Sequence, residues 1–242
     1  AYTYLNYEID PDGVAISLTW AQLHRRVHSL AWELRQLADI GERAVIVAPQ
    51  GLEYVVAFLA TLQAGLIGVP LSVPRAGKGG RHAERIAAVI EDSAPAILLT
   101  TSAVTESLTE YAVAIGDRPA PAIVEVDKLD LDERRKNLKS REEFPETAYL
   151  QYTSGSTRTP AGVMVTNANV SANFEQFVHD QFGAFGHIAP AGTTVAIWLP
   201  FYHDMGLLFG IGYPILGGWH TVFTTPMAFT AKPARWVQMM AS

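Results

Sequence analysis

A run of hydroxyl and glycine residues between two apolar stretches carries the strongest chemical signal in the sequence. The run reads Tyr152-Thr153-Ser154-Gly155-Ser156-Thr157-Arg158-Thr159-Pro160-Ala161-Gly162-Val163. We call residues 153–162 the hydroxyl-rich loop. Its hydroxyl donors, and backbone amides that glycine lets come close, suit the binding of a phosphate chain. The same residue types also make solvent-exposed turns, so the composition alone leaves both interpretations open.

The elements predicted on either side of the loop limit how it could bind phosphate. Residues 148–152 and 163–166 are apolar and strand-like, so the unit is strand, loop, strand, and no helix N-terminus faces a ligand there. The loop also lacks the Gly-Lys-Ser/Thr ending of a Walker motif. A Walker-type site is therefore excluded.

A second group of polar residues follows the predicted strand 194–198. The segment reads Trp198-Leu199-Pro200-Phe201-Tyr202-His203-Asp204-Met205-Gly206-Leu207. A helix is predicted after it, which places His203 and Asp204 beyond the carboxyl end of a strand, where ligands of open α/β sheets bind. His203 is either a ligand-binding residue or a histidine that tethers the loop by hydrogen bonds. Asp204 is typical of a helix N-cap.

The helix expected after Asp204 is rich in glycine. Gly206, Gly210 and Gly212 alternate there with large apolar residues, among them Leu208, Phe209, Ile211 and Ile215. Small residues would leave room for an alkyl chain. A closely packed core helix explains the same residues equally well.

Strand and helix patterns alternate along the first part of the chain. Strands are predicted at 14–18, 44–48, 67–71, 96–99 and 122–126, and helices at 52–63, 81–91 and 103–115. Another helix begins at the capping box formed by Thr19 and Gln22, and its apolar stripe comprises Trp20, Leu23, Val27, Leu30, Leu34 and Leu37. The succession predicts an α/β fold of mostly parallel sheets flanked by helices.

Two segments interrupt this alternation. Residues 72–80 are rich in Gly, Pro and basic residues, and residues 127–145 carry many charges of both signs, so both are expected to be exposed and mobile. We place a boundary between two α/β lobes, residues 1–145 and 146–242, at the end of the second segment. The last predicted helix, from residue 233, is still apolar at residue 240, which favours a fragment of a longer protein.

Composition excludes several classes of function. The 242 residues contain no cysteine, so disulfides, iron–sulfur clusters and cysteine nucleophiles are excluded. A net charge of −6 gives no indication of nucleic-acid binding. No apolar run is long enough for a membrane span and no signal-peptide pattern is present, so a cytoplasmic protein is expected. His24 and His28 have helical spacing but lack a third zinc ligand.

Both polar segments resemble motifs of the adenylate-forming superfamily, which covers acyl-CoA synthetases, fatty-acyl-AMP ligases, luciferases and peptide-synthetase adenylation domains. The hydroxyl-rich loop is similar to its phosphate-binding signature, and residues 203–207 resemble the version in fatty-acyl-AMP ligases. Residues 64–70, Phe229 and residues 233–236 extend the resemblance over most of the chain. The loop departs from the usual pattern at Arg158, where glycine is usual, and at Ala161, where lysine is usual, so one mobile cation is missing.

The resemblance implies a role for each segment. ATP would be held by Thr153, Ser154, Gly155, Ser156, Thr157, Arg158 and Gly162, and Thr153 would also help to hold Mg²⁺. His203 would border the reacting carboxylate as the catalytic residue. The acyl chain would contact Met205, Gly206, Leu208, Gly210 and Ile211. A fatty carboxylate is already ionised near neutral pH, so this adenylation needs no general base.

The activity implied is adenylation of a long-chain fatty acid, with release of pyrophosphate, for transfer to an acyl carrier protein of a polyketide synthase. Two alternatives remain: a long-chain acyl-CoA synthetase, and a non-catalytic module that binds nucleotide or acyl groups. In the family, a Mg²⁺-binding Glu, a ribose-binding Asp and a catalytic Lys lie further along. We therefore expect the 242-residue chain alone to bind nucleotide weakly and not to turn over.

Overall fold

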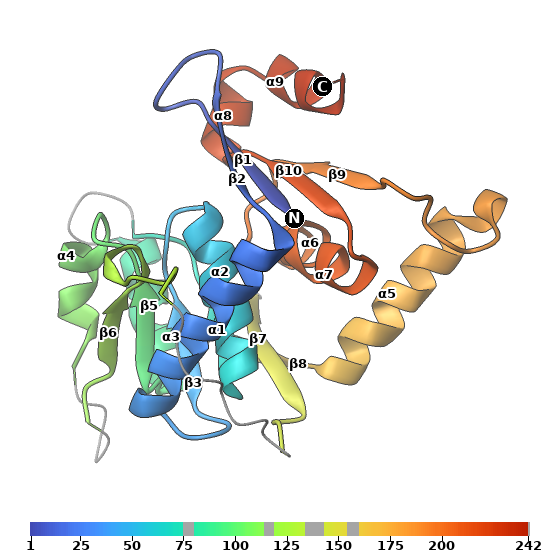
Figure 1. Ribbon diagram of the computed structural model, residues 1–242. Coiled ribbons are helices and arrows are strands. Elements are labelled where there is room, and N and C mark those ends of the chain that lie inside the picture. Colours follow the sequence, from blue (N-terminus) through green and yellow to red (C-terminus); the bar gives the residue numbers. More distant parts are fainter. Residues whose placement is uncertain (75–79, 114–118, 134–142, 154–159, 242) are drawn as a thin grey trace. The chain divides into compact units, whose positions relative to one another are not determined.

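The computed structural model describes residues 1–74, 80–113, 119–133, 143–153 and 160–241 (Figure 1). The strands are β1 (Tyr2–Asn6), β2 (Val14–Leu18), β3 (Arg43–Ile46), β4 (Ile67–Pro70), β5 (Ile97–Thr100), β6 (Ala122–Glu125), β7 (Thr147–Thr153), β8 (Ala161–Thr166), β9 (Thr194–Ile197) and β10 (His220–Phe223). The α-helices are α1 (Trp20–Leu37), α2 (Leu52–Ala64), α3 (Arg81–Ser93), α4 (Thr105–Leu108), α5 (Asn167–Gln181), α6 (Asp204–Leu207), α7 (Tyr213–Gly217), α8 (Pro226–Ala231) and α9 (Ala234–Ala241).

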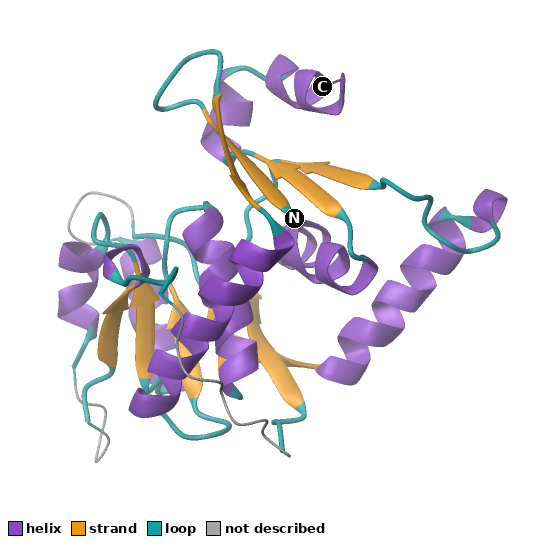
Figure 2. Ribbon diagram, viewed as in Figure 1, coloured by secondary structure: helices purple, strands orange, loops and turns teal. Residues whose placement is uncertain are grey.

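Short helical turns connect several of these elements. Three are 3₁₀ turns, η1 (Thr109–Tyr111), η2 (Val126–Lys128) and η3 (Gly183–Phe185), and η4 (Leu208–Gly212) is a π-helix between α6 and α7. Helices flank the strands as the alternating pattern predicts (Figure 2). Within the described part of the chain, no helix combines the length and apolar character needed to cross a bilayer.

Backbone contacts divide the chain into two compact units. The first comprises Ala1–Leu23, Gln50–Leu52 and Asn167–Ser242, and the second comprises His24–Pro49 and Glu53–Thr166. This division differs from the expected break between residues 145 and 146. β7, which follows that break, pairs with β4 and so continues the sheet of the second unit.

The second unit is built on a six-stranded sheet in the order β6-β5-β3-β4-β7-β8. Its strands pair in parallel from β6 to β7, and only β7 and β8 are antiparallel. The prediction of parallel strands with helical crossovers is confirmed here. The helix predicted at 103–115 is shorter: α4 and η1 end at Tyr111, and residues 114–118 lie outside the described residues.

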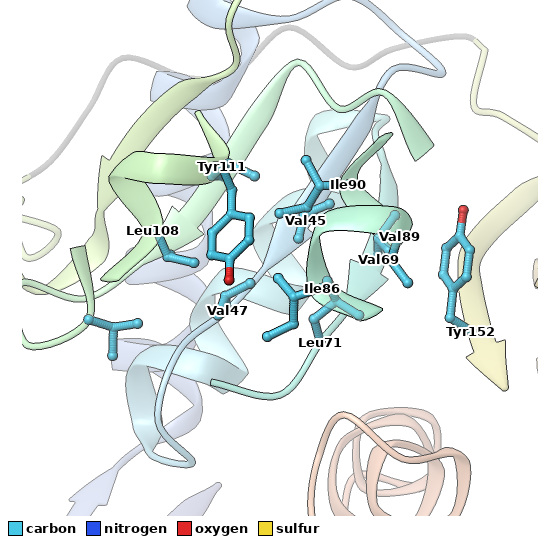
Figure 3. Close-up of a cluster of buried hydrophobic side chains, with 12 residues drawn as sticks. Val45, Val47, Val69, Leu71, Ile86, Val89, Ile90, Leu108, Tyr111 and Tyr152 are labelled. Carbon is cyan, nitrogen blue, oxygen red and sulfur yellow. The ribbon is translucent and has the colours of Figure 1, made fainter. Parts of the chain in front are cut away.

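Side chains from β3, β4, β5 and α3 form the core on one face of this sheet (Figure 3). Val45, Val69, Val89 and Leu98 are fully buried there. Phe58 of α2 packs edge-on against Tyr149 of β7 at a centroid distance of 5.9 Å. Ala44, Val45 and Ile46 of the central strand β3 are all fully buried, so both of its faces are apolar, as expected for a parallel sheet covered by helices on both sides.

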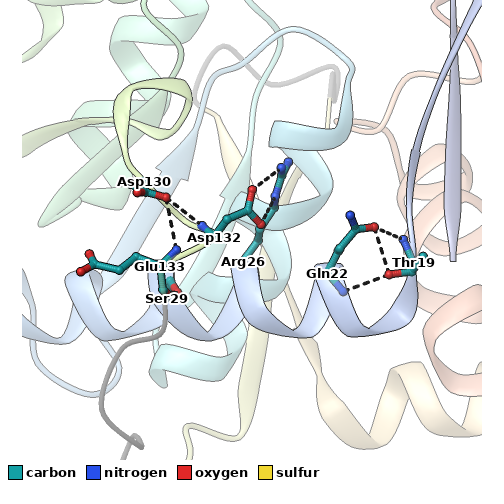
Figure 4. A network of polar contacts seen from close by, with 7 residues as sticks. All are labelled: Thr19, Gln22, Arg26, Ser29, Asp130, Asp132 and Glu133. Atoms are coloured by element: carbon teal, nitrogen blue, oxygen red, sulfur yellow. Dashed lines mark hydrogen bonds and ion pairs between the residues drawn. The ribbon is translucent and has the colours of Figure 1, made fainter.

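Helix α1 follows the sequence pattern closely in its middle part. Thr19 and Gln22 form the predicted capping box: Thr19 N donates to Gln22 Oε1 at 2.9 Å, and Gln22 N donates to Thr19 Oγ1 at 3.2 Å (Figure 4). Leu30 and Leu34 are fully buried, whereas Trp20 and Leu37, at the ends of the predicted stripe, are 42% and 48% exposed.

The charged segment that begins at residue 127 is exposed over most of its described length, and two of its residues contact α1. Arg26 of α1 donates two hydrogen bonds to the Asp132 carboxylate, at 3.1 and 2.7 Å, and Ser29 Oγ donates to the Glu133 carbonyl at 3.1 Å (Figure 4). The expectation of an exposed segment therefore holds for most of residues 127–133, with Leu131 buried and Leu129 half-buried, although Asp132 and Glu133 are tied to α1. Residues 134–142 lie outside the described residues.

The first unit contains a four-stranded sheet in the order β2-β1-β10-β9. β1, β10 and β9 pair in parallel, and β2 is antiparallel to β1. The buried rings of Tyr2, Phe201 and Phe223 pack against one another, with the Phe201 and Phe223 centroids 5.0 Å apart. This sheet positions the loop that carries His203.

Candidate active site

The hydroxyl-rich loop connects the hairpin strands β7 and β8. Thr153 ends β7 and pairs with Ala161, the first residue of β8. The two strands of the predicted strand–loop–strand unit are confirmed. The side chain of Thr153, at the end of the first strand, is exposed. Five predicted site residues, Ser154, Gly155, Ser156, Thr157 and Arg158, lie outside the described residues.

Helix α3 anchors the strand that leads into this loop. The Tyr152 hydroxyl donates to Asp92 Oδ2 at 2.5 Å, and Arg85 Nη2 donates to the Tyr152 carbonyl at 3.2 Å. Burial raises the pKa of Tyr152 well above its ordinary value, and the bond to Asp92 raises it further, so the phenol stays a donor at neutral pH. The loop therefore starts from a fixed strand end.

Gly162 is required by packing at the same strand end. It pairs with Tyr152 across the hairpin, and a Cβ built on Gly162 would lie 2.9 Å from Tyr152 Cζ. The Tyr152 ring thus covers the space that a side chain would fill. The predicted role of Gly162 in nucleotide binding stays a prediction, but the structure supplies a packing reason for glycine there.

We expect Gly162→Ala to lower the free energy of unfolding by about 1–3 kcal/mol, because the buried Tyr152 ring must move aside. Chemical denaturation of both proteins measures this cost. In a Tyr152→Leu background the same glycine change should cost much less, since the overlapping ring is gone. An equal cost in both backgrounds would show that the ring contact is not the cause.

His203 lies in the turn between β9 and α6. It is the N-cap residue of α6 with extended backbone, and its carbonyl accepts from Leu207 N at 2.8 Å. The assignment of the N-cap to Asp204 is therefore wrong by one residue: Asp204 is the first residue of the helix, and its Oδ1 accepts from Met205 N at 2.7 Å. The His203 side chain is exposed, as a substrate-facing residue requires.

Two of the glycines after His203 allow close packing of the helix. A Cβ built on Gly206 would lie 1.9 Å from the Pro200 carbonyl oxygen, and one on Gly210 would lie 2.4 Å from Phe201 Cε1. A Cβ at Gly212 would meet its nearest atom, Leu208 Cδ2, at an ordinary 3.5 Å. The space beside Gly206 and Gly210 is thus filled by the turn itself, which favours the core-packing explanation for these two residues.

A groove opens between α5 and the helical segment from α6 to α7. Its volume is about 350 Å³. Met205 and Leu208, two of the predicted acyl-contacting residues, line it, together with Asn173, Gln176, Phe177, Asp180, Gln181, Asp204, Phe209 and Tyr213. Gly206, Gly210 and Ile211 are buried and are not among the lining residues.

Aromatic rings form one wall of this groove. Phe177 stacks on Tyr213 at a centroid distance of 4.9 Å and meets Phe209 edge-on at 5.1 Å. The Tyr213 hydroxyl donates to Asn173 Oδ1 and so ties α7 to α5. The π-helix η4 carries Leu208 and Phe209 into the groove. Single π turns are often found at functional sites.

The structure gives no support to a metal site at the histidine pair of α1. His24 and His28 stack at a centroid distance of 6.0 Å. Among the residues whose placement is described, no three His, Asp or Glu side chains gather closely enough to hold a metal ion.

Comparison with known proteins places the chain in a family. The model of the AMP-binding enzyme family matches residues 3–242. The chain is 51% identical over 242 residues to the long-chain-fatty-acid–AMP ligase FadD28 of Mycobacterium tuberculosis, and 52% identical over 244 residues to FadD25 of the same organism, which carries a provisional fatty-acid–CoA ligase name.

Solved structures agree with this placement. A fatty acid AMP ligase from Legionella pneumophila is 28% identical with a TM-score of 0.77, and the match covers 98% of this chain and 39% of that one. The two mycobacterial matches cover 100% of this chain and 41% of each relative, so the chain spans less than half of their length. On this evidence, the chain belongs to the AMP-binding enzyme family.

Proposed function

We propose that the protein carrying this chain joins a long-chain fatty acid to AMP at the expense of ATP and releases pyrophosphate. The observation that carries the proposal is 51% identity along the whole chain to a relative named as a long-chain-fatty-acid–AMP ligase. The two sequence motifs and the groove that Met205 and Leu208 line support it. ATP and Mg²⁺ are the co-substrate and metal that this reaction needs.

The hydroxyl-rich loop is the proposed phosphate grip. The fixed strand end at Tyr152 and the exposed Thr153 side chain fit such a role, because donors held in place cost less to organise around a charged ligand. Thr153, Ser154, Gly155, Ser156, Thr157, Arg158 and Gly162 form the proposed nucleotide-binding set. Thr153 is also the proposed Mg²⁺ ligand; Mg²⁺ commonly takes most of its other ligands from phosphate and water.

His203 is the proposed neighbour of the fatty carboxylate. The carboxylate is ionised at neutral pH and attacks the α-phosphorus, while the oxygen that bridges to pyrophosphate leaves with the electron pair. The chain's task is therefore to align two anions and to offset charge, rather than to remove a proton. A histidine donor at an exposed helix N-terminus suits that task.

The groove, whose lining includes Asp204, the residue after His203, is the proposed start of the acyl site. Met205 and Leu208 are the predicted acyl-contacting residues that line it, and its volume falls in the range of small-molecule sites. Gly206, Gly210 and Ile211 are buried outside the groove lining, and the two glycines let the helix that carries Met205 and Leu208 pack directly on the turn before it.

We expect Leu208→Trp to raise the KM for a long-chain fatty acid about 10-fold or more, because the larger ring occupies the groove; the KM for ATP should stay nearly unchanged. Leu216→Trp on α7 is the matched control, since Leu216 is exposed and outside the groove lining. Steady-state pyrophosphate release measures both KM values. If the two substitutions raise the KM for the fatty acid equally, the groove is not part of the acyl site.

Transfer of the acyl group to an acyl carrier protein of a polyketide synthase is the proposed fate of the product. Synthesis of acyl-CoA is the second candidate activity, because the relative FadD25 carries a CoA-ligase name. Incubating the full-length protein with ATP, fatty acid and either CoA or an acyl carrier protein distinguishes the two. Acylation of the carrier protein, with acyl-AMP left to accumulate when only CoA is offered, supports transfer to the carrier protein. Release of acyl-CoA supports the CoA-ligase activity. Failure to form acyl-AMP under any condition overturns both.

A further inference from the structure

The side chain of Gln50 joins two loops of the first unit. Its Oε1 accepts from the backbone N–H of Phe201 at 3.1 Å, and its Nε2 donates to the backbone carbonyl of Thr224 at 2.7 Å. Gln50 belongs to the same compact unit as both partners. One carboxamide thus satisfies a donor and an acceptor that lie more than 20 residues apart in the chain.

Both loops leave the same edge of the four-stranded sheet. β9 and β10 pair in parallel with Ile197 opposite Phe223, so the loops that follow them begin side by side. The pairing extends one residue further, since Thr224 N donates to the Ile197 carbonyl at 3.1 Å. Ligands of open α/β sheets bind beyond the carboxyl ends of such strands. Gln50 therefore bridges the two loops at the edge where a substrate is expected.

The bridged amide lies two residues before His203 and shares its turn. His203 N donates to the Pro200 carbonyl at 3.1 Å, so the backbone of His203 follows that of residues 200 and 201. The Phe201 ring is buried against Phe223 and covers Gly210. The Phe201 amide and the backbone of His203 thus belong to one hydrogen-bonded turn, whereas the imidazole takes no part in the bridge.

We infer that Gln50 is a positioning residue for fatty-acid adenylation: it holds the His203 turn in register with the loop after β10. This inference rests on the proposed function and assigns Gln50 no contact with the substrate. The arrangement needs one acceptor and one donor at the end of a side chain of this length. Glutamate keeps only the acceptor, and alanine keeps neither.

The kinetic test uses the full-length protein with Gln50→Ala and Gln50→Glu, and Gln36→Glu as the matched control on the exposed face of α1. We expect Gln50→Ala to lower kcat for fatty-acid-dependent pyrophosphate release about 10-fold or more, since small misplacement of reacting groups is costly. The KM for ATP should change by no more than about twofold, because the hydroxyl-rich loop is untouched.

Gln50→Glu adds a pH profile that a merely structural role would not produce. Above the pKa of its carboxyl group the new side chain cannot donate to the Thr224 carbonyl, whereas the protonated acid can. The ordinary pKa of a glutamate is about 4.3, so the ratio of the Gln50→Glu rate to that of the wild type should rise as pH falls from about 6 to about 4.5. Gln36→Glu should parallel the wild type throughout. If Gln50→Ala fails to fold, Gln50→Glu carries the test alone.

Hydrogen exchange at the Phe201 amide tests the bridge without any activity. Gln50→Ala should speed exchange there, and Gln50→Glu should keep it slow because the acceptor remains. Unchanged exchange in Gln50→Ala overturns the bridge itself. An unchanged kcat in Gln50→Ala, or a Gln50→Glu profile parallel to the wild type, overturns the positioning role. If the wild type forms no acyl-AMP while exchange responds as described, the proposed function fails and only the bridge stands.

Discussion

Gly206→Ala is expected to lower the free energy of unfolding by about 3 kcal/mol or more and to abolish most fatty-acid activation. The added methyl group would lie 1.9 Å from the Pro200 carbonyl oxygen and 3.1 Å from that of Leu199. Both are backbone atoms of the turn that carries His203, so no side-chain rotation relieves the overlap. The helix must move away from the turn, and His203 must move with it.

Gly212→Ala is the matched control, six residues further along the same helical segment. Its new methyl group meets Leu208 Cδ2 at 3.5 Å, which is an ordinary contact. Alanine also has the higher helix propensity, by up to about 1 kcal/mol, so this variant should be neutral or slightly more stable. Chemical denaturation measured for both variants checks the difference. Equal destabilisation would mean that the contact with Pro200 is not what requires glycine.

The double substitution Thr153→Ala with Ser156→Ala is expected to weaken ATP binding about 100-fold or more. A hydrogen bond to a charged group contributes about 1.5–3 kcal/mol, and two hydroxyl donors are removed. Little loss of stability should accompany the loss of affinity, because the Thr153 side chain is exposed. Isothermal titration calorimetry with ATP and Mg²⁺ measures the affinity directly.

Ser107→Ala with Thr109→Ala provides a matched control for this experiment. Both hydroxyls are exposed in the second unit and donate to carbonyls of their own helical turn, at 2.7 and 3.2 Å. The control removes the same two kinds of hydroxyl and should leave ATP affinity unchanged. Unchanged affinity in the Thr153 and Ser156 variant as well would remove the hydroxyl-rich loop from the mechanism.

Local sequence signals predicted the elements whose cause is local. The capping box at Thr19 forms as predicted, because both partners lie within one turn. The parallel sheet of the second unit follows from apolar runs that alternate with helical patterns. β1 and β10 were not predicted: they pair with each other although they lie at opposite ends of the chain, and no local pattern reveals such a contact.

The features that sequence reasoning missed depend on long-range contacts. α5 was not predicted, although Val170, Phe174, Phe177 and Val178 recur at helical spacing. What its rings contact, Tyr213 and Trp219, lies far along the chain. Gln50 gave no signal, since its role depends on amide and carbonyl groups at residues 201 and 224. The requirement for Gly206 likewise comes from the turn at Pro200. Such residues are found only once the fold is known.

The most direct test of the account is a crystal structure of the full-length protein with an alkyl-sulfamoyl adenosine, a stable mimic of an acyl-adenylate. The account predicts that residues 153–157 contact the sulfamoyl group through hydroxyls and backbone amides. It also predicts that His203 borders the adjoining acyl carbonyl and that the alkyl chain enters the groove at Met205 and Leu208. A bound mimic that leaves residues 153–157 without any contact would contradict the central claim.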